Sequence, residues 1–176
     1  TEGNSDYRQL RDLCFQLRDL DLSDANSIVL PKNAFHSRHQ LEHVRLPKIL
    51  KKIESQAFFA CDKLQEITIP ASVTNIGEAA FSGCKGLESV VIEGTPVLSE
   101  FAFARLEGLK TVKVNSKVPP RADVSTFYGI NRSQVKLIVP KGAEAAYKKA
   151  PGWSRFFAEP KTTKEVSDPS TCLAPY

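Results

Sequence analysis

The side chains best suited to chemistry in this sequence include three closely spaced histidines, His36, His39 and His43. Imidazole is a common zinc ligand, so a metal site is one interpretation of the cluster. The secondary structure expected around them argues against a metal site. His39 falls in an expected turn, and His43 points outward from an expected strand. No helix would bring the three rings onto one face. We therefore predict no bound metal.

The four cysteines are Cys14, Cys61, Cys84 and Cys172. None lies two to four residues from another, the spacing that zinc sites usually show. Cys61 and Cys84 fall at equivalent places one repeat apart, so a disulfide between them is conceivable on distance. We favour two buried thiols, because cysteine packs like a small hydrophobic residue, and the disulfide stays open as the alternative.

Catalytic patterns are weak throughout. The stretch SGCKG at residues 82–86 has the small residues of a turn that carries a catalytic nucleophile, but it is the turn of a repeat. The sequence contains neither the G-x-S-x-G motif nor the phosphate-binding motif G-x-x-x-x-G-K-[ST]. We predict no catalytic residues and no cofactor, and hence a protein that is not an enzyme.

Composition is that of one water-soluble domain. The chain has 176 residues, of which 41% are hydrophobic and 25% charged, with a net charge of +4. Its mildly basic, dispersed charge does not indicate nucleic-acid binding, and no run approaches the ~20 apolar residues of a membrane span. The sequence begins without Met or a signal-peptide pattern, so we expect a mature or trimmed chain.

Internal repetition is the strongest signal in the sequence. An Ala-Phe pair recurs, with the phenylalanines at spacings of 23, 23 and 22 residues: Phe35, Phe58, Phe81 and Phe103. Aliphatic columns keep the same step, among them Leu41, Leu64, Leu87 and Leu109, then Val44, Ile67, Val90 and Val112, then Leu46, Ile69, Ile92 and Val114. Fainter units place Leu20 and Leu22 before this set and Leu137 and Val139 after it.

Each unit predicts a short strand with one buried face. In Leu64–Ile69, Ile67 and Ile69 alternate with Glu66 and Thr68, which is the period of a β-strand. One unit cannot bury its apolar face alone, whereas stacked units can. The strands of successive units are therefore expected to pair in parallel, and Pro70 should end its strand.

The unit LQEITIPASVTNIGEAAFSGC, preceded by LEHVRLPKILKKIESQAFFAC, resembles the BspA-type leucine-rich repeat. The following unit departs from the pattern, with Glu93 in place of proline and Leu106 in place of cysteine. The resemblance implies a leucine-rich-repeat solenoid, a right-handed β/α superhelix of short parallel strands with few short helices. It also implies an exported bacterial protein, secreted or at the cell surface.

One domain is expected over residues 1–176. Its parts are an N-terminal cap at 1–22, repeats at 23–139, a C-terminal cap at 140–159 and a tail at 160–176. Helical spacing predicts a capping helix at residues 6–17, and AEAAYKKA predicts a second helix near the other end. Trp153, Phe156 and Phe157 should cover the last coil.

The outward strand positions offer the one extended surface that could bind a partner. They are His43, Arg45, Glu66, Thr68, Ser89, Val91, Thr111 and Lys113. Their mixed charge and lack of aromatic residues disfavour nucleic acid and sugar, so we predict a protein partner, on a host or a neighbouring cell, and an adhesion or interaction module. The alternative is a structural spacer, or a fragment of a larger surface protein, with no ligand of its own. Oligomeric state is open.

Overall fold

The computed structural model describes residues 16–158. The expected N-terminal helix therefore lies outside the described residues apart from its last two positions. The tail, Cys14 and Cys172 also lie outside them.

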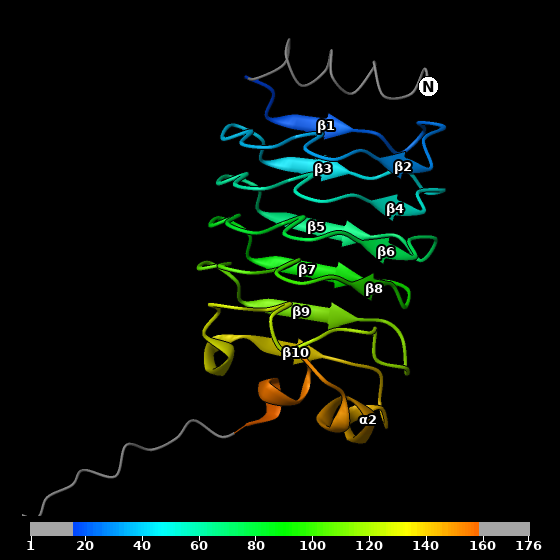
Figure 1. Cartoon of the computed structure of the whole chain (residues 1–176), viewed down its shortest axis with the longest axis vertical. Coiled ribbons are helices and arrows are strands. Elements are labelled where there is room, and N and C mark those ends of the chain that lie inside the picture. Colours follow the sequence, from blue (N-terminus) through cyan, green and yellow to red (C-terminus); the bar gives the residue numbers. More distant parts are fainter. Residues whose placement is uncertain (1–15, 159–176) are drawn as a thin grey trace, which may run out of the picture.

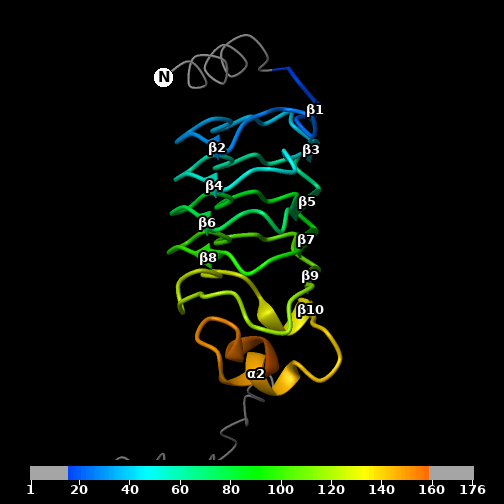
Figure 2. The ribbon, with the colours of Figure 1, turned by 90° about the vertical axis from the view of Figure 1, so that its right-hand side faces the viewer.

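The described chain winds into a stack of similar coils, each crossing two parallel sheets (Figure 1). The larger sheet has six strands in the order β1 (Asp19–Asp21), β3 (His43–Arg45), β5 (Glu66–Ile69), β7 (Ser89–Ile92), β9 (Thr111–Val114) and β10 (Lys136–Ile138). The smaller sheet has four, in the order β2 (Val29–Leu30), β4 (Lys52–Ile53), β6 (Asn75–Ile76) and β8 (Val97–Leu98). Figure 2 shows the two sheets along opposite edges of the stack. The leucine-rich-repeat solenoid predicted from the repeat is confirmed.

The strand register follows the aliphatic columns of the sequence. Ile67 pairs with Val90, and Val90 pairs with Val112, so equivalent residues stack directly above one another. The two fainter units join the same sheet, since Leu20 pairs with Val44 and Leu137 pairs with Val112. Side chains in these columns point into the stack and form one continuous hydrophobic core.

The repeated phenylalanines form a spine through that core. Ring centroids lie 5.3 Å apart for Phe35 and Phe58, 5.2 Å for Phe58 and Phe81, and 5.3 Å for Phe81 and Phe103. Phe127 continues the stack at 5.7 Å from Phe103. The spine therefore has one more member than the four found in the sequence.

Each turn that carries a spine ring also contains backbone in the left-handed region. Gln56 and Ala60 have φ of 56° and 55° in one coil, and Ala79 and Gly83 have 51° and 76° in the next. The equivalent places recur because the turn geometry repeats with the sequence.

Three short helices lie near the C-terminal end of the stack: η1 (Arg132–Gln134) precedes β10, and α2 (Glu144–Lys149) and η2 (Ser154–Phe157) follow it. Trp153 is fully buried, packs edge-on against Phe127, and donates its indole N–H to the carbonyl of Pro120 at 2.7 Å. The Tyr147 hydroxyl, in α2, donates to the carbonyl of Ser116 at 2.8 Å. The expected aromatic cover over the last coil is thus present. In the described residues, no helix has the length and apolar character to cross a membrane.

Candidate interaction surface

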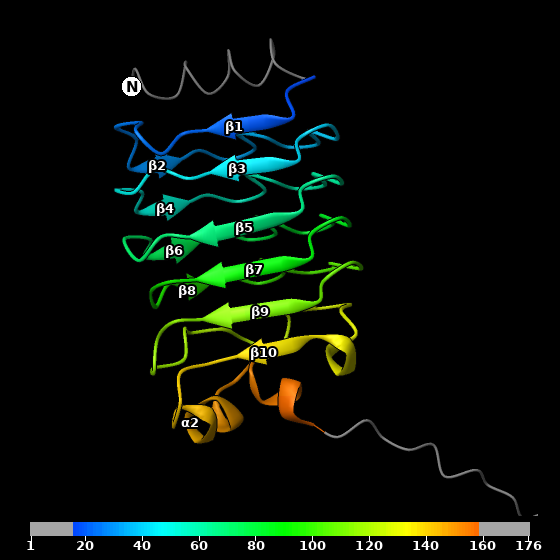
Figure 3. The same ribbon diagram turned by 180° about the vertical axis from the view of Figure 1, so that it is seen from behind.

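All eight predicted surface residues lie on the outer face of the larger sheet. Its strands alternate exposed and buried positions, as in Glu66–Ile69, where Glu66 and Thr68 face solvent. Pairing stacks the exposed positions into columns: His43 pairs with Glu66, and Thr68 pairs with Val91. Figure 3 shows the strands of this sheet one above another, and their register places the exposed residues in columns.

Both columns continue to the ends of the sheet. Asp19 pairs with His43 and Asp21 with Arg45, while Lys136 pairs with Thr111 and Ile138 with Lys113. Sequence reasoning missed these four residues, although they alternate with leucines already assigned to the two fainter units. We call the whole set the ribbon: one column is Asp19, His43, Glu66, Ser89, Thr111 and Lys136, and the other is Asp21, Arg45, Thr68, Val91, Lys113 and Ile138.

Ion pairs link neighbouring coils at the N-terminal end of the ribbon. The guanidinium of Arg45 lies 3.2 Å from a carboxylate oxygen of Asp21. Hydrogen bonds from the side chain and backbone of Ser23, followed by the charge of Arg45, hold the pKa of Asp21 below its usual value. Asp21 is therefore a carboxylate at neutral pH.

A shallow hollow interrupts the ribbon between β3 and β5. These two strands pair only at His43 and Glu66, whereas β5 and β7 pair at four positions. Glu93 and Asn115 each donate a backbone N–H to the strand one coil earlier. Pro70, at the same place after β5, has no N–H to give. The strands part there, and a hollow of about 450 Å³ opens beside Arg45, Glu66 and Thr68.

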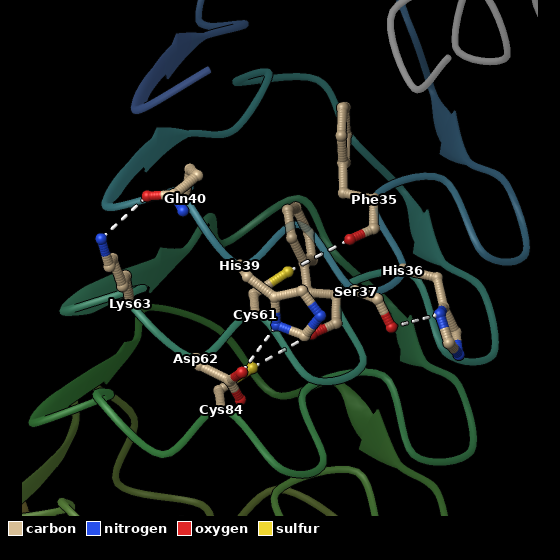
Figure 4. A network of polar contacts seen from close by, with 10 residues as sticks. Phe35, His36, Ser37, His39, Gln40, Cys61, Asp62, Lys63 and Cys84 are labelled. Atoms are coloured by element: carbon tan, nitrogen blue, oxygen red, sulfur yellow. Dashed lines mark hydrogen bonds and ion pairs between the residues drawn. The ribbon is translucent and has the colours of Figure 1, made fainter. Parts of the chain in front are cut away.

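The three histidines do not converge. His39 Nδ1 lies 2.6 Å from Asp62 Oδ2, while His36 Nδ1 lies 2.8 Å from the Ser37 hydroxyl and its ring stacks on Phe59 (Figure 4). His43 faces outward on the ribbon. No cluster of metal-binding side chains occurs among residues 16–158.

Cys61 and Cys84 are free thiols, as favoured from the sequence. Each is fully buried and donates to a carbonyl one coil earlier, Cys61 to Phe35 at 3.1 Å and Cys84 to Phe58 at 3.0 Å (Figure 4). Burial raises the pKa of the Cys84 thiol well above its usual value, and Cys61 adds to the shift. Both are structural thiols, and Cys84 carries no charge at neutral pH.

The outer face of the smaller sheet is narrower than the ribbon. Its two-residue strands each present one outward side chain, and Lys52, Asn75 and Val97 are exposed there. This face has the same coil spacing as the ribbon, so it provides a matched control surface.

Comparison with known proteins agrees with the geometry. The sequence profile of the BspA-type leucine-rich repeat region matches residues 11–143 in six copies. A search of curated proteins gave no match.

Three solved structures are similar to this chain. The pneumococcal vaccine antigen PcpA has a TM-score of 0.60 at 22% identity, over 76% of this chain and 39% of that one. A leucine-rich cell surface protein from Faecalibacterium prausnitzii has a TM-score of 0.45 at 19% identity, over 72% of this chain and 38% of that one. A leucine-rich-repeat protein from Bacteroides ovatus has a TM-score of 0.48 at 23% identity, over 76% of this chain and 36% of that one. This chain spans less than two fifths of the length of each. With the profile covering most of its residues, the chain belongs to the BspA-type leucine-rich-repeat family.

Proposed function

We propose that this chain is a non-catalytic interaction module of an exported bacterial protein, located at the cell surface or secreted. It binds a protein partner, on a host or a neighbouring cell, through the ribbon. A similar solved protein, PcpA, is described as a pneumococcal vaccine antigen, which supports this location.

The observation that carries the proposal is the continuity of the ribbon. A six-stranded sheet with no helix over its outer strand face, among the described residues, presents two columns of side chains that run along all six strands. The rigid core holds those side chains at fixed spacing, so little conformational entropy is lost when a partner binds. Elsewhere the described surface consists mainly of turns and of the narrow smaller sheet.

A structural spacer is the second candidate, and the ion pairs between coils favour it. Arg45 already pairs with Asp21, and Arg18 pairs with Glu42 at 2.7 Å beside the ribbon. Charges satisfied within the chain need no external partner. In that case the coils hold other parts of a longer protein apart, and the ribbon is only a solvated face.

Site-specific photo-crosslinking distinguishes the two candidates. A photoreactive phenylalanine analogue replaces Thr68 on the ribbon or, as the control, Asn75 on the smaller sheet, and the full chain is presented to intact bacterial or epithelial cells. We expect a discrete crosslinked product from position 68 and none from position 75. Equal labelling from both, or from neither, would favour the spacer.

A combined substitution tests the same surface by loss of binding. Replacing Arg45, Thr68, Val91 and Lys113 together with alanine should abolish binding to the crosslinked partner on an immobilised-protein array. Replacing Lys52, Asn75 and Val97 together should leave it unchanged. Binding that survives the fourfold substitution would show that the ribbon is not the contact surface.

A further inference from the structure

The charges on the ribbon are segregated along the stack. Its N-terminal half, on β1, β3 and β5, carries the carboxylates of Asp19, Asp21 and Glu66 against the single guanidinium of Arg45, which leaves a net charge of −2. Its C-terminal half, on β7, β9 and β10, carries the ammonium groups of Lys113 and Lys136 and no carboxylate, a net charge of +2. The ribbon therefore has an acidic end and a basic end.

Side chains that flank the first residue of each strand leave this polarity intact. Arg18 pairs with Glu42 inside the acidic half, and Lys110 pairs with Glu88 at 2.8 Å inside the basic half. Each of these two ion pairs has no net charge, so neither pair changes the net charge of its half of the ribbon. Lys113 and Lys136 are both exposed, and no ion pair within the described residues involves either of them.

Between the charged side chains of the two halves, strand β7 contributes only uncharged side chains to the ribbon. Thr68, Ser89, Val91 and Thr111 occupy consecutive places across β5, β7 and β9. Two such surfaces placed face to face and antiparallel would bring acidic end to basic end twice, with neutral side chains meeting at the centre. A two-fold axis requires this kind of self-complementarity, in which each patch meets its counterpart on the other copy.

We propose that the partner of the ribbon is a second copy of this chain, bound face to face with the two stacks antiparallel. The inference rests on the proposed function, because it uses the same surface and names its occupant. Copies on two opposing cells would meet in this orientation, so the pairing would act as homophilic adhesion.

The pairing is expected to be weak for one pair of molecules. Six strands about 4.8 Å apart give the ribbon a length of roughly 24 Å. A surface of this size is smaller than the ~800 Å² per partner of a typical stable interface. Exposed ion pairs also contribute little individually and are screened by salt. Multivalent display is therefore needed to detect it.

The experiment uses beads coated with the full chain and measures their clustering. At about 0.01 M salt, where the Debye length is near 30 Å, we expect wild-type beads to cluster, and at about 1 M salt we expect them to stay dispersed. The acidic end is reversed in the variant D19K/D21K and the basic end in K113E/K136E. Each variant has two ends of like charge, so neither should cluster with itself.

The decisive arm mixes the two variants. A bead with two basic ends should cluster with a bead with two acidic ends as strongly as wild type does, and the fourfold reversal in one chain should restore self-clustering. The variant K32E/K52E, which changes one residue of β4 and one residue of the turn after β2, should behave as wild type. Mixed variants that stay dispersed, or wild-type beads that stay dispersed at low salt, would overturn the homophilic pairing.

That failure is separable from failure of the proposed function. If the beads stay dispersed while a foreign protein crosslinks at position 68, the ribbon binds a different partner and only the homophilic inference is wrong. If position 68 gives no product with cells or with a second copy, the interaction role itself is wrong.

Discussion

The central coils and the last coil of this molecule are held together in different ways. In the centre, identical residue types meet from one coil to the next: Phe81 lies between Phe58 and Phe103, and the Cys84 thiol reaches the Phe58 carbonyl. In the last coil and cap, individual polar contacts take over, such as those of Tyr147 and Trp153 with backbone carbonyls. Repetition builds the stack, and single contacts end it.

The difference has an energetic consequence. In a stack where each unit touches only its neighbours, stability is approximately a sum of unit and interface terms. A defect in the centre weakens two interfaces at once, whereas a defect at the end weakens one. The size of an effect and its spread along the chain should therefore both depend on which region is altered.

The largest effect is expected from Phe81→Ala. Phe81 is fully buried and stacks on rings at 5.2 Å and 5.3 Å, so its removal leaves a cavity on both sides and should cost about 3–5 kcal/mol. Urea unfolding followed by circular dichroism measures the loss. Phe101→Ala removes a ring that is only partly buried and should cost less than about 1 kcal/mol. Similar losses for the two variants would contradict the spine as the main support of the centre.

The same regional difference explains what the sequence could reveal. Columns such as Val44, Ile67 and Val90 recur at a fixed step along the sequence. Repeating one coil at that step is enough to predict the strands, the phenylalanine spine and the outward ribbon. Phe127 escaped detection because Thr126 precedes it in place of alanine, and because its 24-residue step from Phe103 differs from the earlier ones. Thr126 is buried, and its hydroxyl donates a hydrogen bond to the carbonyl of Ser99 at 3.3 Å, which offsets the cost of burying a polar group.

Contacts that depend on backbone position could not be read from side-chain patterns. The indole of Trp153 was expected to cover the last coil, but its bond to the Pro120 carbonyl depends on how the chain returns after β9. The hollow beside Arg45 has a signal in the sequence, since Pro70 lacks the donor that Glu93 provides in the next coil. The charge polarity of the ribbon became visible only when both end strands were paired.

At the C-terminal end, Trp153→Phe should cost about 1–3 kcal/mol. The variant keeps an aromatic ring but leaves the Pro120 carbonyl without its indole donor in a buried place. We expect amide hydrogen exchange to accelerate in β10 and to stay unchanged in β5. Tyr147→Phe, which removes the bond to Ser116 in the same way, is the matched variant. Faster exchange throughout the stack would mean that the cap and the centre unfold as one unit.

Within the last coil, Asp123→Ala should cost roughly 1 kcal/mol at neutral pH. Its carboxylate accepts hydrogen bonds from the Ser125 hydroxyl at 2.6 Å and from the backbone N–H of Ser125 and Thr126. The Ser125 side chain, with those N–H groups, holds the pKa of Asp123 below its usual value.

The pH dependence of this contact has a definite sign. Because the folded pKa is the lower one, the stabilisation is present above about pH 4 and is lost as pH falls through the folded value. The difference in unfolding free energy between wild type and Asp123→Ala should therefore shrink between pH 7 and pH 3. A constant difference over that range would mean that the carboxylate charge is not what stabilises the turn.

The smallest effects should come from the left-handed turn position that the coils share. Gly83 has φ of 76° and an added Cβ would lie 3.8 Å from its nearest neighbour, so Gly83→Ala tests backbone conformation without a clash. We expect Gly83→Ala to lower the free energy of unfolding by about 0.5 kcal/mol. An L-residue is penalised in the left-handed region, but alanine also reduces the conformational entropy of the unfolded chain, which offsets part of that penalty. Ala60, one coil earlier at φ of 55°, should show the opposite sign, so Ala60→Gly should stabilise by a similar amount.

Gly129→Ala applies the same change in the last coil, at φ of 73°. If it matches Gly83→Ala in urea unfolding, the last coil retains the repeat's turn and differs only in how its surface is covered. A cost several times larger would show that the two regions differ in backbone geometry as well.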